Sequence, residues 1–324
     1  MIKISVDLMG GDNSPHAILE AIQDFSNVHF LLHGLESVKS EIKNYKIISY
    51  DFFSCDIAIN DNEKFGIREI EASSMYSAID AVAKGAADAV VSGGSSGYYL
   101  LLCKRVLGLL ESISRPALTT AIPTLKKPII MMDLGANLSC SETDLVKFGM
   151  MGHSLARFWL DYENPNVKFV NVGEELGKGP ALVRDAASQL SDTMPDVETG
   201  FVEPNFILDG DAHVVVTDGF TGNCLLKMSE GVAGFFRKSL KKAFLSSFLG
   251  RVLGYFAKNL LKENLVDPRD FNGAIWAGVN GCAIKSHGGS DAVAVRSAIK
   301  FAIKIAKKKD SLLNTLKSDL SKIL

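Results

Sequence analysis

The sequence has no long hydrophobic run: no stretch of roughly 18 consecutive apolar residues is free of charged side chains. We therefore expect no transmembrane helix, and the opening residues MIKISVDLMGGD are typical of a buried strand rather than of a signal peptide. The formal net charge of -2 gives no overall attraction to nucleic acid. These absences indicate a cytoplasmic protein without a nucleic-acid partner.

Metal-binding and disulfide motifs are also missing. The chain has 5 cysteines without CxxC spacing, as is typical of reduced thiols in a cytosolic protein. His29 and His33 flank the apolar residues FLL, and His153 lies in a helical pattern, so none of them has the neighbours of a zinc ligand. We expect no metal site, structural or catalytic, and no cofactor.

Two nucleotide-binding motifs are incomplete. Ser92 stands where the dinucleotide fingerprint needs its first glycine, and no acidic residue lies about 20 residues beyond Gly97. The segment 173–179 is one residue shorter than a P-loop, and Gly179 stands where Ser or Thr would bind magnesium. NAD binding and nucleotide hydrolysis are therefore not expected.

Short apolar runs alternate with helical patterns along the chain. Examples are IKISVDLM before a helix from Pro15, KPIIMMDLG before LVKFGMMGHSLARFWL, and AHVVVTDG before LLKMSEGVAGFF. Helix starts are marked by Asn13-Ser14-Pro15 and by Ser141, which forms a capping-box pattern with Asp144. The alternation predicts an α/β fold with a parallel sheet, and no linker or repeat interrupts it. We expect one domain over residues 1–324.

Polar loops that contain glycine follow five of the predicted strands. They are GGDNS at 10–14, SGGSSG at 92–97, LGAN at 134–137, GEELGKG at 173–179 and DGFTGN at 218–223. Because the strands of a parallel sheet all end at one edge, we expect these loops to line one mouth. Glycines permit close approach of a ligand, and backbone N–H groups at helix starts favour an anion. The loops together predict phosphate, although glycine after a strand is also common in plain turns.

Three polar residues in two of these loops are candidates for chemistry. Lys178 lies between two glycines, where a short loop can direct its ammonium to a phosphate, but a solvated surface lysine is the alternative. Asp218 and Asn223 end a strand and begin a helix in VTDGFTGN, so each is also suited to a cap or a turn. Capping and catalysis can coexist at these positions.

His287 lies in the polar segment IKSHGGSD, before the basic helical pattern AVAVRSAIKFAIKIAKKK. Lys285, Ser286 and Ser290 lie beside it. A lone histidine is more often structural, so a site role and a structural role both stay open at this stage.

A serine hydrolase is a competing interpretation. Gly93 to Gly97 fits G-x-S-x-G after a predicted strand, and Ser95, Asp218 and His287 come in the chain order of that class. The His-Gly-Gly segment comes last, whereas the oxyanion-hole loop of those hydrolases precedes the nucleophile. A non-catalytic scaffold at the membrane surface is a third interpretation.

The segment from Phe235 to Lys262 carries only positive charges. They are Arg237, Lys238, Lys241, Lys242, Arg251, Lys258 and Lys262. Its apolar side chains Phe236, Leu240, Phe244, Phe248, Val252 and Phe256 approximate helical spacing. The pattern predicts an amphipathic helical insertion at about 235–265 that lies on anionic lipid, or packs in a dimer interface, or does both.

Several segments, taken in order, resemble the bacterial phosphate acyltransferases of phospholipid synthesis. They are MGGDNSP, SISRPALTTAIPTL, MDLGANLSCSETDLVKFGMMGHS, NVGEELGKG, VTDGFTGNCLLKMSEG and GVNGCAIKSHGGSD, and they cover nearly the whole chain. The resemblance implies reversible transfer of a fatty acyl group from acyl carrier protein to inorganic phosphate. The product, acyl phosphate, would supply a membrane glycerol-3-phosphate acyltransferase in phosphatidic acid and phospholipid synthesis.

The same resemblance implies a peripheral membrane homodimer with a three-layer α/β/α fold. Its mostly parallel sheet would resemble isocitrate-dehydrogenase-like proteins and phosphotransacetylases. Carried over by motif, the catalytic residues are Lys178, Asp218, Asn223 and His287. The substrate-binding residues are Gly94, Ser95, Ser96, Gly97, Asn137, Lys285 and Ser286.

In the mechanism that we infer from these assignments, phosphate attacks the thioester directly, since the thiol leaves readily with a pKa near ~8.5. Lys178 and backbone N–H groups of 92–97 would hold phosphate, and Asn223 would donate to the oxyanion. His287 would remove a phosphate proton, with Asp218 orienting it or Lys178.

The chain also departs from the family pattern. The family usually has Asn and Thr where Ser95 and Ser96 stand, and a small residue in place of Tyr98. Before Ser73-Ser74-Met75 the family tends to be basic, whereas this chain has Glu-Ile-Glu at 69–71. That change argues against docking of the carrier protein at this edge.

Overall fold

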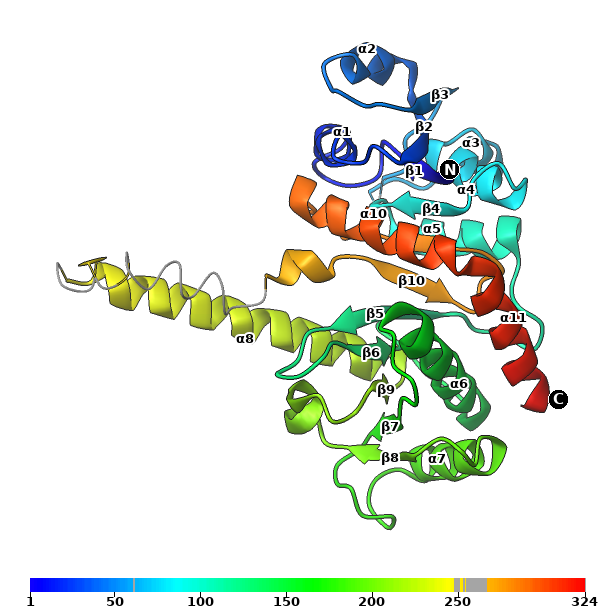
Figure 1. The fold of residues 1–324 in the computed structure, drawn as a ribbon, viewed down its shortest axis with the longest axis vertical. Helices are drawn as coiled ribbons and strands as arrows, with labels where there is room; N and C mark the ends of the chain where they lie inside the picture. Colours follow the sequence, from blue (N-terminus) through cyan, green and yellow to red (C-terminus); the bar gives the residue numbers. More distant parts are fainter. Residues whose placement is uncertain (61, 248–250, 253, 255–266, 324) are drawn as a thin grey trace.

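A single sheet of eleven strands runs through the protein in the computed structural model, which describes residues 1–324 except 61, 248–250, 253, 255–266 and 324 (Figure 1). The strands are β1 Ile2–Asp7, β2 Val28–Leu35, β3 Tyr50–Cys55, β4 Ala89–Ser92, β5 Ala117–Ile122, β6 Ile129–Met132, β7 Val167–Val170, β8 Thr199–Val202, β9 Val214–Val216, β10 Ala274–Ala277 and β11 Ala283–Lys285. Their spatial order is β3-β2-β1-β4-β11-β10-β5-β6-β9-β7-β8.

Helices cover both faces of this sheet. They are α1 His16–Ile22, α2 Lys39–Ile42, α3 Ile67–Glu71, α4 Ser74–Ala83, α5 Ser96–Leu102, α6 Glu142–Trp159, α7 Ala181–Thr193, α8 Gly219–Leu245, α10 Ala292–Lys307 and α11 Lys309–Leu320. The main apolar core joins one sheet face to α1, α6, α7, α10 and α11, of which α6 and α10 lie in front of the strands in Figure 1. Two smaller cores join the other face to α4, α5 and the start of α8. The predicted three-layer α/β/α architecture is confirmed.

The strands run in two directions, and this divides the sheet into two halves. Neighbouring described strands are parallel except at three pairs, because β10 runs antiparallel to β11 and β5, and β5 runs antiparallel to β6. The strands β1, β4 and β11 therefore end at one edge, which we call the first strand edge. The strands β6, β7 and β9 end at the opposite edge, the second strand edge. The sheet is mostly parallel, as predicted.

Alternation along β1 and β4 decides which side chains reach each face near the first strand edge. Val6 and Val91 belong to the main core beside α1 and α10. Their neighbours Asp7 and Ser92 point to the other face, where Asp7 accepts a hydrogen bond from Ser74 at the start of α4. At these strand ends, the polar side chains thus face α4 and the apolar side chains face α10.

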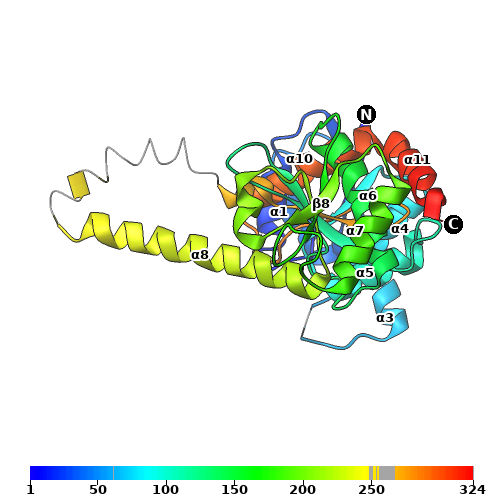
Figure 2. The ribbon, with the colours of Figure 1, turned by 90° about the horizontal axis from the view of Figure 1, so that it is seen from below.

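The helix starts follow local sequence signals. The capping box of Ser141 and Asp144 forms at α6 as predicted, since each side chain accepts from the backbone N–H of the other. The helix after Asn13-Ser14-Pro15 begins at His16. The predicted insertion begins inside α8, which runs unbroken through residue 245 and projects from the layers (Figure 2). Phe248, Phe256, Lys258 and Lys262 lie outside the described residues, and no helix among those described is long and apolar enough to cross a membrane.

His33 on β2 is a buried titratable group within this fold. Its side chain is 2% exposed and its Nδ1 lies 2.8 Å from the Ser77 hydroxyl, while Nε2 is buried without a hydrogen-bond partner. Burial lowers the pKa of His33 to about 4, against the opposing effect of Asp80. The folded protein therefore holds this ring neutral in mildly acidic solution.

We expect His33 to make the fold less stable as the pH falls from 6.5 to about 4. In that window the unfolded chain binds a proton that the folded chain does not, and the cost grows to roughly 3 kcal/mol at the acidic end. Urea unfolding of His33→Gln should show a flatter pH dependence than wild type over this range. His16→Gln, at an exposed position, should retain the wild-type slope. An unchanged slope in His33→Gln would contradict the assignment.

Candidate active site

Three loops meet at the first strand edge, because β1, β4 and β11 are adjacent in the sheet. Loop 10–14 follows β1, loop 92–97 follows β4, and loop 286–290 follows β11. Residues of all three line one pocket, whose floor is apolar and includes Val6 and Val91. Ser14 also lines this pocket, and its buried hydroxyl has no hydrogen-bond partner among the described residues.

The first two loops touch through their backbones, and this contact requires glycine. A Cβ on Gly93 would lie 2.7 Å from the carbonyl oxygen of Gly10, and a Cβ on Gly10 would lie 2.6 Å from the Gly94 nitrogen. A side chain at either position would separate the loops. Glycine thus permits a close approach that leaves polar backbone at the surface of the pocket.

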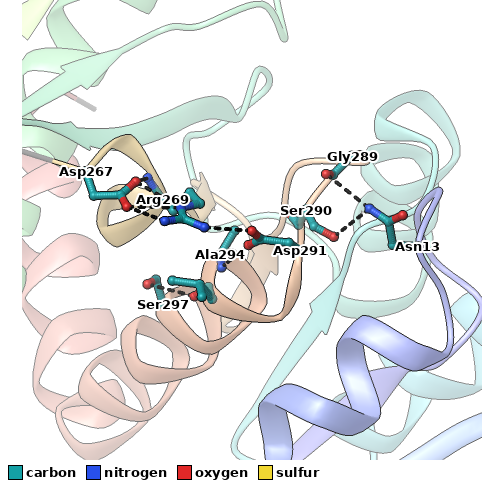
Figure 3. Close-up of polar contacts among 9 residues, drawn as sticks. Asn13, Asp267, Arg269, Gly289, Ser290, Asp291, Ala294 and Ser297 are labelled. Carbon is teal, nitrogen blue, oxygen red and sulfur yellow. Dashed lines mark hydrogen bonds and ion pairs between the residues drawn. The ribbon is translucent and has the colours of Figure 1, made fainter. Parts of the chain in front are cut away.

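Loop 286–290 is held to loop 10–14 by hydrogen bonds. The Asp12 backbone N–H donates to the Gly288 carbonyl at 2.8 Å. The Asn13 side-chain amide donates to the carbonyls of Gly289 at 3.3 Å and Ser290 at 3.1 Å (Figure 3). These contacts close the pocket on the side of α1.

A second asparagine, which the sequence did not mark, holds the same loop from the other side. The Asn272 amide donates to the Ser286 hydroxyl at 2.8 Å, and its oxygen accepts from the His287 N–H at 3.1 Å. Beyond it, Arg269 pairs with Asp291 at 2.9 Å, and Asp291 caps α10 through the Ala294 N–H (Figure 3). Asn272 lies in an irregular segment before β10, where no motif signals such a role.

The ring of His287 is exposed and its hydrogen bonding decides which nitrogen carries the proton. The Gly289 N–H donates to His287 Nδ1 at 3.2 Å. A backbone N–H donates only to an unprotonated ring nitrogen, so the neutral ring carries its proton on Nε2. In this arrangement His287 offers a donor to a ligand rather than a free proton acceptor.

Lys285 is buried at the end of β11, at 9% exposure. Its ammonium donates to the carbonyls of Gly93 at 3.1 Å and Ser286 at 2.5 Å. It therefore joins the loops that follow β4 and β11. Near it, Ser95 is 7% exposed, whereas Ser96 and Gly97 open α5 at the surface.

The other predicted site residues gather at the second strand edge. The buried Asp133 accepts from the Asn137 backbone at 2.7 Å and from its side-chain amide at 2.9 Å. Burial raises the pKa of Asp133, and these donors oppose the shift. Asp218 caps α8 by accepting from the Thr221 N–H at 2.9 Å, and Asn223, one turn into α8, lies beside Gly135.

Lys178 lies in the loop after β7, at the same second edge. Its exposed ammonium pairs with Glu175 at 2.7 Å, and this contact raises the pKa of Lys178. The loop is tied back by Asn171, whose amide donates to the Lys178 carbonyl at 3.0 Å. In the isolated chain the ammonium thus has a carboxylate partner at the surface.

The prediction that all five glycine loops line one mouth is therefore wrong for the isolated chain. The antiparallel strands β10 and β5 reverse the chain direction in the middle of the sheet, so the two halves end at opposite edges. The first strand edge carries Gly94, Ser95, Ser96, Gly97, Lys285, Ser286 and His287. The second carries Asn137, Lys178, Asp218 and Asn223.

Comparison with known proteins identifies the family of this chain. Residues 2–311 match the family described as fatty acid synthesis protein. The chain belongs to this family. The phosphate acyltransferase of Rhodospirillum rubrum is 37% identical over 99% of this chain and 95% of its own length. That of Paramagnetospirillum magneticum is 38% identical over 94% and 90%. The predicted family and the predicted class of enzyme, an acyltransferase, are confirmed.

Solved structures of this family's fold agree with the architecture. A phosphotransacetylase from Streptococcus pyogenes superposes with a TM-score of 0.63 at 16% identity, covering 95% of this chain and 94% of that one. At this identity the likeness concerns the fold alone. The predicted resemblance to phosphotransacetylases is confirmed at that level.

The geometry disfavours the serine-hydrolase interpretation, because Asp218 caps α8 at the second edge while Ser95 and His287 belong to the first. We expect no labelling of Ser95 by a fluorophosphonate probe, measured by mass spectrometry of the intact protein. A known serine hydrolase in the same reaction should be labelled fully. Labelling that disappears in Ser95→Ala would restore the hydrolase interpretation.

Proposed function

We propose that this protein transfers a fatty acyl group reversibly from acyl carrier protein to inorganic phosphate, and that the acyl phosphate serves phosphatidic acid and phospholipid synthesis. The family and the phosphate acyltransferases at 37% and 38% identity support the reaction class. The observation that carries the proposal is the pocket at the first strand edge. Its lining includes Ser286, His287 and Ser290, and also Ser14, whose buried hydroxyl has no hydrogen-bond partner among the described residues.

The reaction needs no other reactant. A hydrogenphosphate oxygen attacks the thioester carbonyl carbon, forming a C–O bond as the C–S bond breaks. The proton of hydrogenphosphate passes to the departing thiolate, so the products are acyl phosphate and the free thiol of the carrier. Because a thioester is already activated, the protein's contribution is placement and stabilisation of the developing oxyanion.

His287 is the side chain to which we assign the most direct role. With its proton on Nε2, the neutral ring can donate to a phosphate oxygen or to the departing sulfur. Ser286 is buried at 2% exposure and its hydroxyl is oriented by Asn272 and Ser290. Together they supply donors on the α10 side of the pocket, opposite loop 92–97.

The roles inferred for Lys178, Asp218 and Asn223 require more than one chain. These residues lie at the second strand edge, whereas the pocket lies at the first, and a second copy of the chain could bring the two together. We propose a homodimer, and we assign these residues to it rather than to the pocket of the single chain.

The direct test is phosphate-dependent release of thiol from acyl-loaded carrier protein. We expect His287→Gln and Ser286→Ala to raise the KM for phosphate about tenfold, since a hydrogen bond to a charged group contributes roughly 1.5–3 kcal/mol. His29→Gln, on β2 away from the pocket, should match wild type. Release by wild type that does not depend on phosphate would contradict the proposed reaction. If Lys178→Ala raised the KM for phosphate and His287→Gln did not, the phosphate site would be assigned to the second strand edge instead.

We also propose that α8 holds this cytoplasmic enzyme at an anionic membrane surface. Its described residues expose Phe235 at 66%, Phe236 at 58% and Leu240 at 45%. Arg237, Lys238, Lys241 and Lys242 are interleaved with them. An apolar face with basic flanks is suited to anionic headgroups, and the same face is also suited to a second copy of the chain. The proposed membrane glycerol-3-phosphate acyltransferase would receive the product there.

Substitutions on this face of α8 distinguish binding to lipid from contact with a second copy of the chain. We expect Phe235→Asp with Phe236→Asp to abolish sedimentation with phosphatidylglycerol vesicles and to leave turnover of soluble acyl carrier protein within about twofold. Leu125→Asp, at a side chain that is 86% exposed in the β5–β6 turn, is the matched control. Unchanged sedimentation would contradict the lipid contact, and a halved mass in gel filtration would assign the face to the dimer.

A further inference from the structure

A buried polar cluster lies beneath the glycine turn of loop 92–97, on the α4 face of the sheet. Asp7, at the end of β1, is 1% exposed. Its carboxylate accepts from the Ser92 hydroxyl and from the Ser74 hydroxyl, each at 2.7 Å. Ser74 belongs to the Ser73-Ser74-Met75 segment, to which the proposed reaction gives no role.

Ser92 connects Asp7 to the glycine turn through hydrogen bonds. Its hydroxyl hydrogen is committed to Asp7, so its lone pairs are free to accept from the Gly94 N–H, at 3.1 Å. Met75 packs against the same glycine, because a Cβ on Gly94 would lie 2.5 Å from the Met75 methyl carbon. Lys285 holds the carbonyl of Gly93. Contacts from β1, α4 and β11 thus converge on two consecutive glycines.

Asp7 is among the residues that line the pocket, but its carboxylate accepts hydrogen bonds from Ser74 and Ser92 on the α4 side of the sheet. Along β1 the alternate residue Val6 faces the α10 side and forms part of the pocket floor, whereas Asp7 points to α4. The carboxylate is held by the Met9 N–H, Ser74 and Ser92, so it acts on the loop that follows β4. That separates a positioning role from a catalytic one.

We propose that Asp7 is a positioning residue that fixes the Gly93-Gly94 turn through Ser92, with Ser74 and Met75 holding the cluster from α4. The proposal rests on the assignment of loop 92–97 to phosphate. Three donors meet the carboxylate, since the Met9 N–H also donates at 3.1 Å. Three hydrogen bonds to one buried side chain suit a group that must hold a turn of two glycines in one conformation.

Burial raises the pKa of Asp7, whereas the two serine hydroxyls, the Met9 N–H and the charge of Lys285 oppose the shift. These groups offset part of the cost of burying the carboxylate. Replacement by an amide keeps the shape, but its NH₂ group competes with one of the serine donors.

The test uses phosphate-dependent thiol release with the full-length protein. We expect Asp7→Asn and Ser92→Ala each to raise the KM for phosphate about tenfold while the KM for acyl carrier protein stays within about twofold. Because both act through one chain of contacts, the double variant should be no worse than the more severe single one. Ser188→Ala and Asp192→Asn, on the exposed side of α7, are the matched controls.

A second measurement does not depend on the reaction. Hydrogen exchange of peptides covering 92–97 should be faster in Asp7→Asn and in Ser92→Ala than in wild type, with other peptides unchanged. Thiol release by wild type without phosphate dependence would overturn the proposed function, and the exchange result would still decide the role of Asp7. Additive effects in the double variant, equal changes in both KM values, or unchanged exchange at 92–97 would each overturn the positioning role.

Discussion

The contact on which the candidate site depends is the backbone approach of two glycine turns, at Gly10 and Gly93. Neither position has room for a Cβ, since each would meet the backbone of the opposing loop. This approach brings the loops after β1 and β4 together beside a pocket with an apolar floor. Loop 286–290 then closes on the pair through Asp12 and Asn13. The pocket results from backbone packing, with side chains holding it from outside.

The reversal of strand direction in the middle of the sheet is the second constraint. It divides the glycine loops between two edges, although their sequences are alike in composition. Two polar side chains at the second edge are satisfied internally: Asp133 is surrounded by donors of its own turn, and Lys178 has Glu175 as its partner. The loops at the first edge retain an unpartnered hydroxyl at Ser14 and an exposed imidazole at His287. This difference, rather than glycine content, distinguishes a candidate anion site from a set of turns.

Local signals in the sequence were sufficient for the layers and for many element boundaries. The capping box of Ser141 and Asp144 and the alternation of apolar runs with helices appear in the structure as expected. The direction of β5 and β10 could not be predicted in this way, because a short apolar strand has the same sequence pattern whether its neighbour is parallel or antiparallel. Asn272 was missed for a related reason, since its partners Ser286 and His287 are distant in sequence and lie outside any motif that includes it. Asp7 looked like part of a strand, and its role depends on Ser74 and Ser92, which only the folded sheet brings near.

The central claim is that phosphate binds at the first strand edge, between loops 10–14, 92–97 and 286–290. A crystal structure of the full-length protein soaked in inorganic phosphate tests it most directly. We expect phosphate density within hydrogen-bond distance of loop 92–97 and of Ser286 or His287. Ordered phosphate bound only by Lys178 and the loops of the second edge would contradict it.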